Sequence, residues 1–200
     1  MNFDPSRRVI LAGLLSATSV LAAPGAFALS ESEARKLIDT AVAEINKIIN
    51  SGKSESQMYG DFERIFRKYA DVPTIARSAL GPPAREASSS QMNAFTDAFA
   101  GYLSRKYGKR FREFIGGQIE VKSARAVKTF QEVQAVALLK GQPPFEISFM
   151  VSDRSGSDKF FDLLIEGISL LKSERAEIGA MLDKRRGDID GLVSDLKKAG

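Results

Sequence analysis

The stretch Gly116-Gly117-Gln118-Ile119-Glu120-Val121-Lys122-Ser123-Ala124 divides the sequence into two parts with different periodicities. Before the glycine pair, apolar side chains recur every three or four residues, which is typical of helices. After it, they alternate with polar side chains, which is typical of half-buried strands. Two adjacent glycines also end the longest helical pattern in the chain. The sequence therefore predicts a helical part followed by a β-sheet.

Four helical segments are predicted before the glycine pair. Ser30 with Glu33 and Ser88 with Gln91 have the spacing of capping boxes, and Asp71 is suited to an N-cap position. The residues that follow each cap carry the helical apolar period until a glycine or proline stops it. The predicted ranges are 31–50, 56–69, 72–80 and 89–115.

Four strands are predicted after the glycine pair, followed by further helices. Short links rich in glycine, proline and serine separate the strands, which favours antiparallel neighbours. The predicted strands are 119–124, 133–139, 145–151 and 160–165, and helical periodicity returns over 170–184 and after Asp188. The fold class is therefore predicted as α+β.

The first 28 residues have the features of an export signal. Arg7 and Arg8 precede the apolar run 9–15, and residues 26–28 form an A-x-A cleavage site. The apolar stretch is interrupted well short of the roughly 20 residues that a membrane span needs. Residues 1–28 are therefore predicted to be cleaved, leaving 29–200 as a single domain. The paired arginines also suit a twin-arginine signal, so both that route and Sec remain open.

The composition excludes most familiar kinds of catalytic site. The chain has no Cys and no His, so it lacks thiol nucleophiles, imidazole bases and the usual zinc ligands. Its net charge of +4 is too small to indicate nucleic-acid binding by itself. We therefore expect no enzyme activity, no metal and no nucleic-acid partner.

Three short motifs have simple structural interpretations. Gly52-Lys53-Ser54 resembles the end of a P-loop, but the earlier glycine and the preceding strand are missing, so a helix-terminating loop is predicted. Asp162 and Glu166 lie at a strand end, and Asp188 with Asp190 begins the last helix, where hydrogen bonding and capping explain them. A small hydrolase that uses Ser or Asp remains the weakest alternative, because no supporting box is present.

The fourth helical segment combines an aromatic stripe with a basic cluster. The stripe consists of Phe95, Phe99, Leu103, Tyr107 and Phe111, with Phe114 beside it, and such a stripe is most often plain core. The basic cluster contains Arg105, Lys106, Lys109, Arg110 and Arg112, of which Arg105, Lys109 and Arg112 face away from Tyr107 and Phe111. A solvated helix face explains the cluster, as would contact with anionic lipid headgroups or an acidic partner.

Several stretches together resemble the MlaC family of periplasmic lipid carriers, also called toluene-tolerance proteins. They occur in the family order over nearly all of residues 29–200, and the stretch around Glu166-Gly167-Ile168-Ser169 is the most specific. Ala84 and Asp158 depart from the pattern, since the family often has a large aromatic there. The matching stretches are Asp71-Val72-Pro73, Ala76-Arg77, Leu80-Gly81, Ala87-Ser88 with Gln91, Phe95, Phe99 and Tyr107, Gly141-Gln142-Pro143-Pro144, Phe161-Asp162, Ile165 to Leu170 and Ile189-Asp190-Gly191-Leu192.

The resemblance implies a fold and a binding site. The expected fold is a twisted four-stranded antiparallel sheet wrapped by six or seven helices around an apolar pocket for acyl chains. The resemblance also raises the expectation that the aromatic stripe lines this pocket, with the basic residues Arg105, Lys106, Lys109 and Arg110 contacting a membrane or partner. The expected lipid-binding residues are Phe95, Phe99, Leu103, Tyr107, Phe111, Phe114, Phe149, Phe161, Leu163, Ile165, Ile168 and Leu171.

The function implied is that of a monomeric periplasmic carrier without catalysis and with no cofactor other than bound lipid. Its implied ligand is a phospholipid. Its implied partners are an inner-membrane ABC transporter complex with an MCE-domain subunit and an outer-membrane lipoprotein complex, which together maintain lipid asymmetry. Two alternatives remain open, a carrier of hopanoid-like lipid and a periplasmic adaptor with a solid core.

Overall fold

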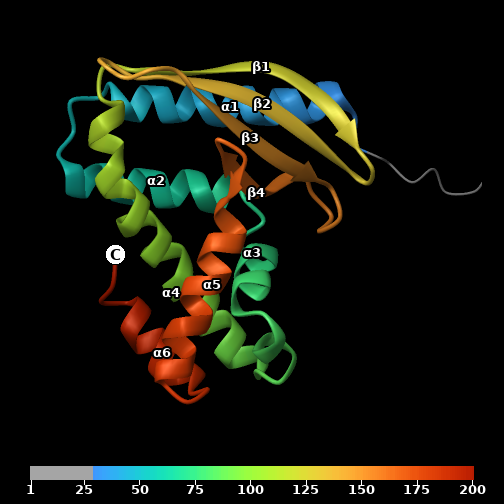
Figure 1. Cartoon of the computed structure of the whole chain (residues 1–200), viewed down its shortest axis with the longest axis vertical. Helices are drawn as coiled ribbons and strands as arrows, with labels where there is room; N and C mark the ends of the chain where they lie inside the picture. Colours follow the sequence, from blue (N-terminus) through green and yellow to red (C-terminus); the bar gives the residue numbers. More distant parts are fainter. Residues whose placement is uncertain (1–28) are drawn as a thin grey trace, which may run out of the picture.

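The structure is a computed structural model that describes residues 29–200, apart from the side chains of 110–112. The predicted export signal, residues 1–28, lies outside the described residues. The described part is α+β, with six α-helices, two 3-10 helices and one antiparallel sheet (Figure 1). The helices are α1 (Glu31–Ile49), α2 (Glu55–Tyr69), α3 (Val72–Leu80), η1 (Pro82–Arg85), α4 (Ser89–Gly108), η2 (Lys109–Phe114), α5 (Leu170–Lys184) and α6 (Ile189–Leu196).

The caps predicted from the sequence begin the helices that they were expected to begin. The Ser30 hydroxyl accepts a hydrogen bond from the backbone N–H of Glu33, and the Ser88 hydroxyl accepts one from that of Gln91, each at 3.2 Å. Asp71 caps α3 in the same way, through the N–H of Thr74. These bonds satisfy backbone donors that the first turn of a helix leaves free.

The sheet is a meander in which each strand pairs with the next, and it contains five strands, not the four predicted. The additional strand is short because Glu166 and Gly167, with φ of 50° and 78°, reverse the chain and pair Ile165 with Ile168. The strands are β1 (Gln118–Val127), β2 (Phe130–Leu138), β3 (Phe145–Ser152), β4 (Lys159–Ile165) and β5 (Ile168–Ser169).

One face of the sheet is covered by α1, which lies along β1 and β2 in Figure 1. Alternate side chains of β2 and β3 point to this face, as the period of a strand requires. They pack against the apolar stripe of α1, so the N-terminal helix and the sheet share one core. Its buried residues are Leu29, Ala34, Ile38, Val42, Ile119, Val133, Ala135, Ala137, Ile147, Phe149 and Val151.

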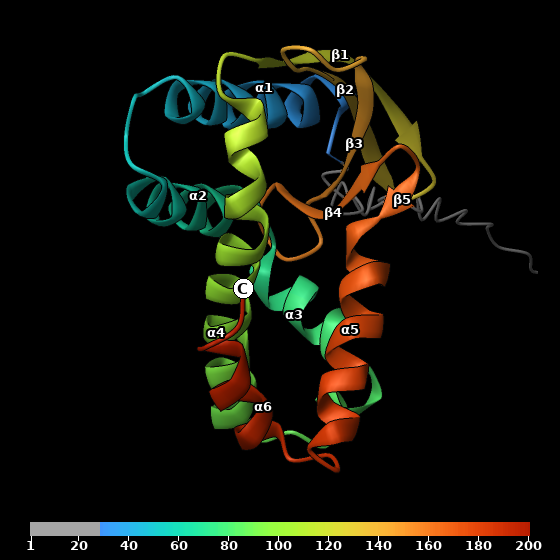
Figure 2. The same ribbon diagram turned by 60° about the vertical axis from the view of Figure 1, so that its left-hand side comes forward.

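A second core is formed mainly by helices. Figure 2 shows α4 running beside α6, with α3 and α5 opposite, below the sheet. The α-helical part of the fourth predicted helix ends at Gly108, earlier than expected, and the chain continues as η2. The Tyr59 ring lies against Gly108, where an added Cβ atom would clash with the ring, so α2 and α4 approach closely at this point. In the part of the chain that the structure describes, no helix is long and apolar enough to span a bilayer.

A third core lies between α1 and α2, and all three cores meet at Phe160 on β4. The Phe160 side chain packs against the buried residues of each cluster. The backbone adds a tie at this point, because the N–H of Asp71 donates to the carbonyl oxygen of Phe160 at 2.8 Å. The junction between α2 and α3 is thus fixed to β4 where the sheet meets the helices.

Candidate functional site

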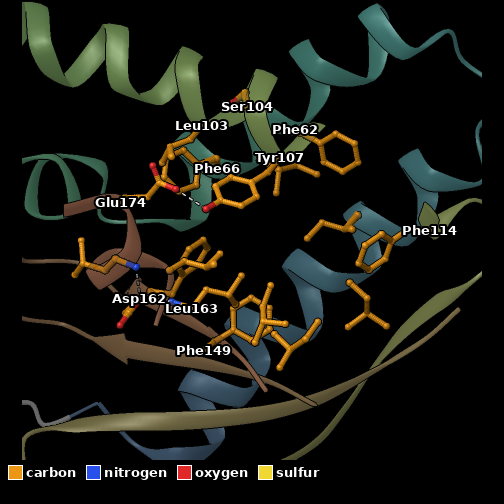
Figure 3. A pocket seen from close by; sticks show the side chains of 18 of the residues that line it. Phe62, Phe66, Leu103, Ser104, Tyr107, Phe114, Phe149, Asp162, Leu163 and Glu174 are labelled. Atoms are coloured by element: carbon orange, nitrogen blue, oxygen red, sulfur yellow. Dashed lines mark hydrogen bonds between the residues drawn. The ribbon is translucent and has the colours of Figure 1, made fainter. Parts of the chain in front are cut away.

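A cavity of about 320 Å³ lies between the sheet and the helices α2, α4 and α5 (Figure 3). The sheet provides one wall through β3 and β4, and the C-terminal end of α4 provides another, with Leu103, Ser104 and Tyr107. Most of the lining side chains are aliphatic or aromatic. A volume of this size lies within the range of about 300–1,000 Å³ that is usual for small-molecule sites.

The structure brings most of the predicted binding residues to this cavity. They come from α4, η2, β3, β4 and α5, which are far apart in the sequence and meet only in the fold. In β3 and β4 their positions follow the strand register, which places Phe149 opposite Leu163. The predicted residues on the cavity wall are Leu103, Tyr107, Phe114, Phe149, Phe161, Leu163, Ile165 and Leu171.

Phe95 and Phe99 do not line this cavity. Both are fully buried in the helical core, where their rings stack with centroids 5.5 Å apart. The reason is that α4 is long: its middle packs against α3 and α6, and only its C-terminal end reaches the cavity. The Phe111 side chain lies outside the described residues.

Ile168 is also placed away from the cavity. Its side chain is 65% exposed, because it follows the tight turn formed by Glu166 and Gly167. The neighbouring Leu170 and Leu171 do reach the cavity, from the first turn of α5.

Several cavity residues were not identified as site residues from the sequence. On α1, α2 and α3 the helical period placed some of these side chains on an apolar face, but periodicity does not show which part of a buried face meets a void. Phe160 on β4 and Phe145 on β3 were likewise expected only as strand residues. The residues concerned are Ile45, Phe62, Ile65, Phe66, Ile75, Ile119, Leu139, Phe145, Ile147, Phe160 and Leu170.

The basic side chains at the end of α4 make intramolecular bonds. Arg105 donates to the carbonyl oxygens of Leu196 at 2.6 Å and Ala199 at 2.9 Å, and Lys109 donates to that of Gly200 at 2.9 Å. These two residues therefore hold the end of the chain against α4. The Arg110 side chain lies outside the described residues.

Lys106 is the centre of a polar network that joins α4 to α5 at the edge of the cavity. Its ammonium donates to Glu174 at 2.7 Å and to Glu177 at 2.5 Å. The Tyr107 hydroxyl also donates to Glu174, as the dashed line in Figure 3 marks, and the Tyr102 hydroxyl donates to Glu177. Two helices are thus linked by long side chains beside an otherwise apolar space.

The network shifts the titration of its members. Burial alone would lower the pKa of Lys106, but the hydrogen bonds to Glu174 and Glu177 outweigh it and raise this pKa. Hydrogen bonds from Lys106 and Tyr102 lower the pKa of Glu177 below its ordinary value of 4.5. Burial, followed by the hydrogen bond to Glu174, raises the pKa of Tyr107, so its hydroxyl keeps its proton.

Replacing Lys106 by methionine is expected to lower the free energy of unfolding at pH 7 by about 3 kcal/mol, because it leaves buried Glu174 without its cation. Urea denaturation measures this. The pKa of Glu177 is lowered in the folded state. The carboxylate of Glu177 therefore stabilises the fold above about pH 4.5, and this contribution is lost as the pH falls through the folded-state pKa. The difference between variant and wild type should therefore shrink at pH 3.

Lys172→Met is the matched control, since Lys172 is an exposed lysine near the start of α5. It should change the free energy of unfolding by no more than about 0.5 kcal/mol. Equal losses from the two substitutions would contradict the assigned role of Lys106.

Asp162 is another polar residue of the cavity wall, and its side chain serves the fold. Both carboxylate oxygens of Asp162 are used, one by the N–H of Leu171 at 3.0 Å and the other by the Ser169 hydroxyl at 2.6 Å. Asp162 thereby fixes the junction between β4 and α5, in agreement with the predicted hydrogen bonding at a strand end. Among residues 29–200, no three acidic side chains are grouped to hold a metal ion.

Comparison with known proteins places these features in a family. The phospholipid-binding protein from Ralstonia solanacearum, solved in complex with a phospholipid, superimposes with a TM-score of 0.71. The two chains are 22% identical over 82% of this chain and 95% of that chain, a likeness that shows a common fold. The sequence profile of the MlaC protein family matches residues 39–198. Because that match extends from within α1 to beyond α6, the chain belongs to the MlaC family.

Proposed function

We propose that this protein is a periplasmic lipid carrier that holds acyl chains in the cavity between the sheet and α4. The observation that carries the proposal is the cavity itself, about 320 Å³ with a mainly aliphatic and aromatic lining. A solidly packed adaptor protein has no need of such a space, because protein interiors are normally filled to crystal-like density. The structural relative bound to a phospholipid supports the same ligand class.

The apolar lining accounts for the tight lipid binding that a carrier needs. Burial of each CH₂ group contributes about 0.8 kcal/mol, so ten methylenes would contribute roughly 8 kcal/mol before the cost of ordering the chain. Each methylene of a second chain would add the same contribution, so a lipid with two chains would be held far more tightly than a single chain. Spontaneous loss of the lipid to water would therefore be slow, and release would need help from a membrane or a partner.

Membership of the MlaC family supports a proposal about the wider role. We propose that residues 29–200 act as one non-catalytic, monomeric domain, exported by the Sec or the twin-arginine route. The carrier would shuttle phospholipid between an outer-membrane lipoprotein complex and an inner-membrane ABC transporter complex with an MCE-domain subunit. Exchange of labelled lipid with and without these complexes tests the shuttle, and equal rates in the two cases would contradict it.

Native mass spectrometry of the protein purified from its own cells tests lipid binding directly. We expect a complex with lipid in stoichiometric amount, because a cavity of this kind should not be emptied by aqueous purification. Fragmentation of the bound species then separates a phospholipid from a hopanoid-like lipid. A folded protein that carries no lipid would refute the carrier and support a structural role.

A further inference from the structure

Glu174 is an acidic residue in the wall of a cavity that is otherwise mostly apolar. It lies near the start of α5, and only 2% of its surface is exposed. Its Oε1 atom accepts two hydrogen bonds, from Lys106 and from Tyr107. Its Oε2 atom is buried and accepts none. The carboxylate is thus only half satisfied.

The remaining oxygen distinguishes Glu174 from Ser104 and Asp162, two other polar residues of the wall. The Ser104 hydroxyl bonds to the carbonyl oxygen of Ala100 at 2.9 Å, and Asp162 uses both of its oxygens. Among the described residues, two other side chains have a buried oxygen without a hydrogen bond, Glu44 and Gln131, and neither lines the cavity. A buried acceptor without a donor is unfavourable, so a carboxylate that turns toward the cavity and meets a donor there would gain a hydrogen bond that it now lacks.

The charge of the surrounding network favours the same kind of ligand group. Lys106 is shared between Glu174 and Glu177, so the three charged side chains together carry one excess negative charge. The hydroxyls of Tyr102 and Tyr107 both direct their protons to these carboxylates. What the network offers a ligand is therefore acceptor atoms and negative charge, which suits an ammonium or a hydroxyl and disfavours a bare phosphate.

We propose that Glu174 and its partners form a polar subsite that receives a hydrogen-bond donor on the headgroup of the bound lipid, an ammonium or a hydroxyl. The proposal rests on the proposed lipid-binding function and deepens it. In this arrangement the acyl chains occupy the space lined by Phe149 and Leu163, while the donor group lies at the α4–α5 edge of the cavity. The subsite gives the carrier a preference among phospholipids with identical chains.

Uptake from mixed vesicles tests the subsite. The vesicles contain phosphatidylethanolamine, phosphatidylglycerol and phosphatidylcholine in equal amounts, all with the same acyl chains, and mass spectrometry quantifies the lipids that the protein takes up. Phosphatidylcholine is the critical probe, because its quaternary ammonium has no N–H to donate. Since a hydrogen bond to a charged group contributes about 1.5–3 kcal/mol, we expect wild type to prefer a donor-bearing lipid over phosphatidylcholine by at least roughly tenfold.

Glu174→Gln should reduce this preference to about twofold or less, because the amide keeps the size of the side chain but loses its charge. Glu86→Gln is the matched control, since Glu86 is an exposed glutamate outside the cavity lining, and it should leave the preference intact. Circular dichroism shows which variants are folded. If Glu174→Gln does not fold, the ranking of the three lipids by wild type still decides the question.

Each outcome has a distinct meaning. Preference for phosphatidylethanolamine alone supports an ammonium donor, and preference for phosphatidylglycerol as well supports hydroxyls too. Equal uptake of all three lipids would overturn the subsite, with water as the donor to Oε2, while lipid binding would stand. A preference that survives in Glu174→Gln would also overturn it. If no lipid is taken up at all, the carrier function fails.

Discussion

Leu103→Glu is expected to abolish stoichiometric lipid binding while leaving the protein folded. Leu103 is half-buried near the end of α4, and its side chain lies on the cavity wall (Figure 3). A bound acyl chain would cover the new carboxylate, and removing a charge from water without a partner costs several kcal/mol. We therefore expect the retained lipid to fall at least tenfold, as measured by native mass spectrometry of the purified variant.

Ile168→Glu provides the matched control for this prediction. It introduces the same charge in place of an aliphatic side chain, but Ile168 is exposed and does not line the cavity. The lipid content of this variant should equal that of wild type. Loss of lipid from Ile168→Glu, or normal lipid content in Leu103→Glu, would show that the acyl chains lie elsewhere.

Phe99→Ala is expected to lower the free energy of unfolding by about 3–5 kcal/mol, one of the largest effects of any single truncation. Phe99 is fully buried in the helical core and stacks with Phe95 and Tyr102, so removing its ring would leave an unfilled space. Urea denaturation of the lipid-free protein measures this loss. The variant that remains folded should still bind lipid, because the ring does not line the cavity.

Phe145→Ala is the comparison for Phe99→Ala, because Phe145 is half-buried on the cavity wall and already borders empty space. It should cost clearly less stability in the lipid-free protein, since fewer packed neighbours lose a contact. Its larger effect should be on lipid retention. A reversed order of the two stabilities would contradict the division of the aromatic residues between core and cavity.

Local signals allowed most of the fold to be predicted from the sequence. The capping pairs at Ser30 and Ser88 determine helix starts, and the range 170–184 agrees with α5. β5 was missed because two residues are too few to show a period. β2 begins at Phe130, earlier than the predicted residue 133. The turn before it was not predicted, because its residue with positive φ is Lys128, with φ of 54°, and not a glycine. These errors occur where the backbone conformation is unusual for the residue type.

The candidate site was less predictable because its residues meet only through the tertiary structure. Periodicity along α4 placed Phe99 and Tyr107 on one stripe, yet the helix crosses from the helical core to the cavity between them. Similarly, the sequence alone suggests that Lys106 is a solvent-exposed lysine. Only the fold shows its partner, because Glu174 on α5 lies 68 residues away in the sequence. A helical pattern specifies a face, and only the packing of the other helices specifies what that face meets.

The meeting of three cores at Phe160 affects how readily the protein would be degraded in the cell. A lipid in the cavity would contact Phe160 together with residues of all three cores. It would therefore link cores that could otherwise unfold locally and independently of one another. Such a ligand stabilises the folded state by mass action. Empty molecules would be the ones that proteases cut, since cleavage depends on transient opening. The abundance of the protein would then follow the supply of its lipid.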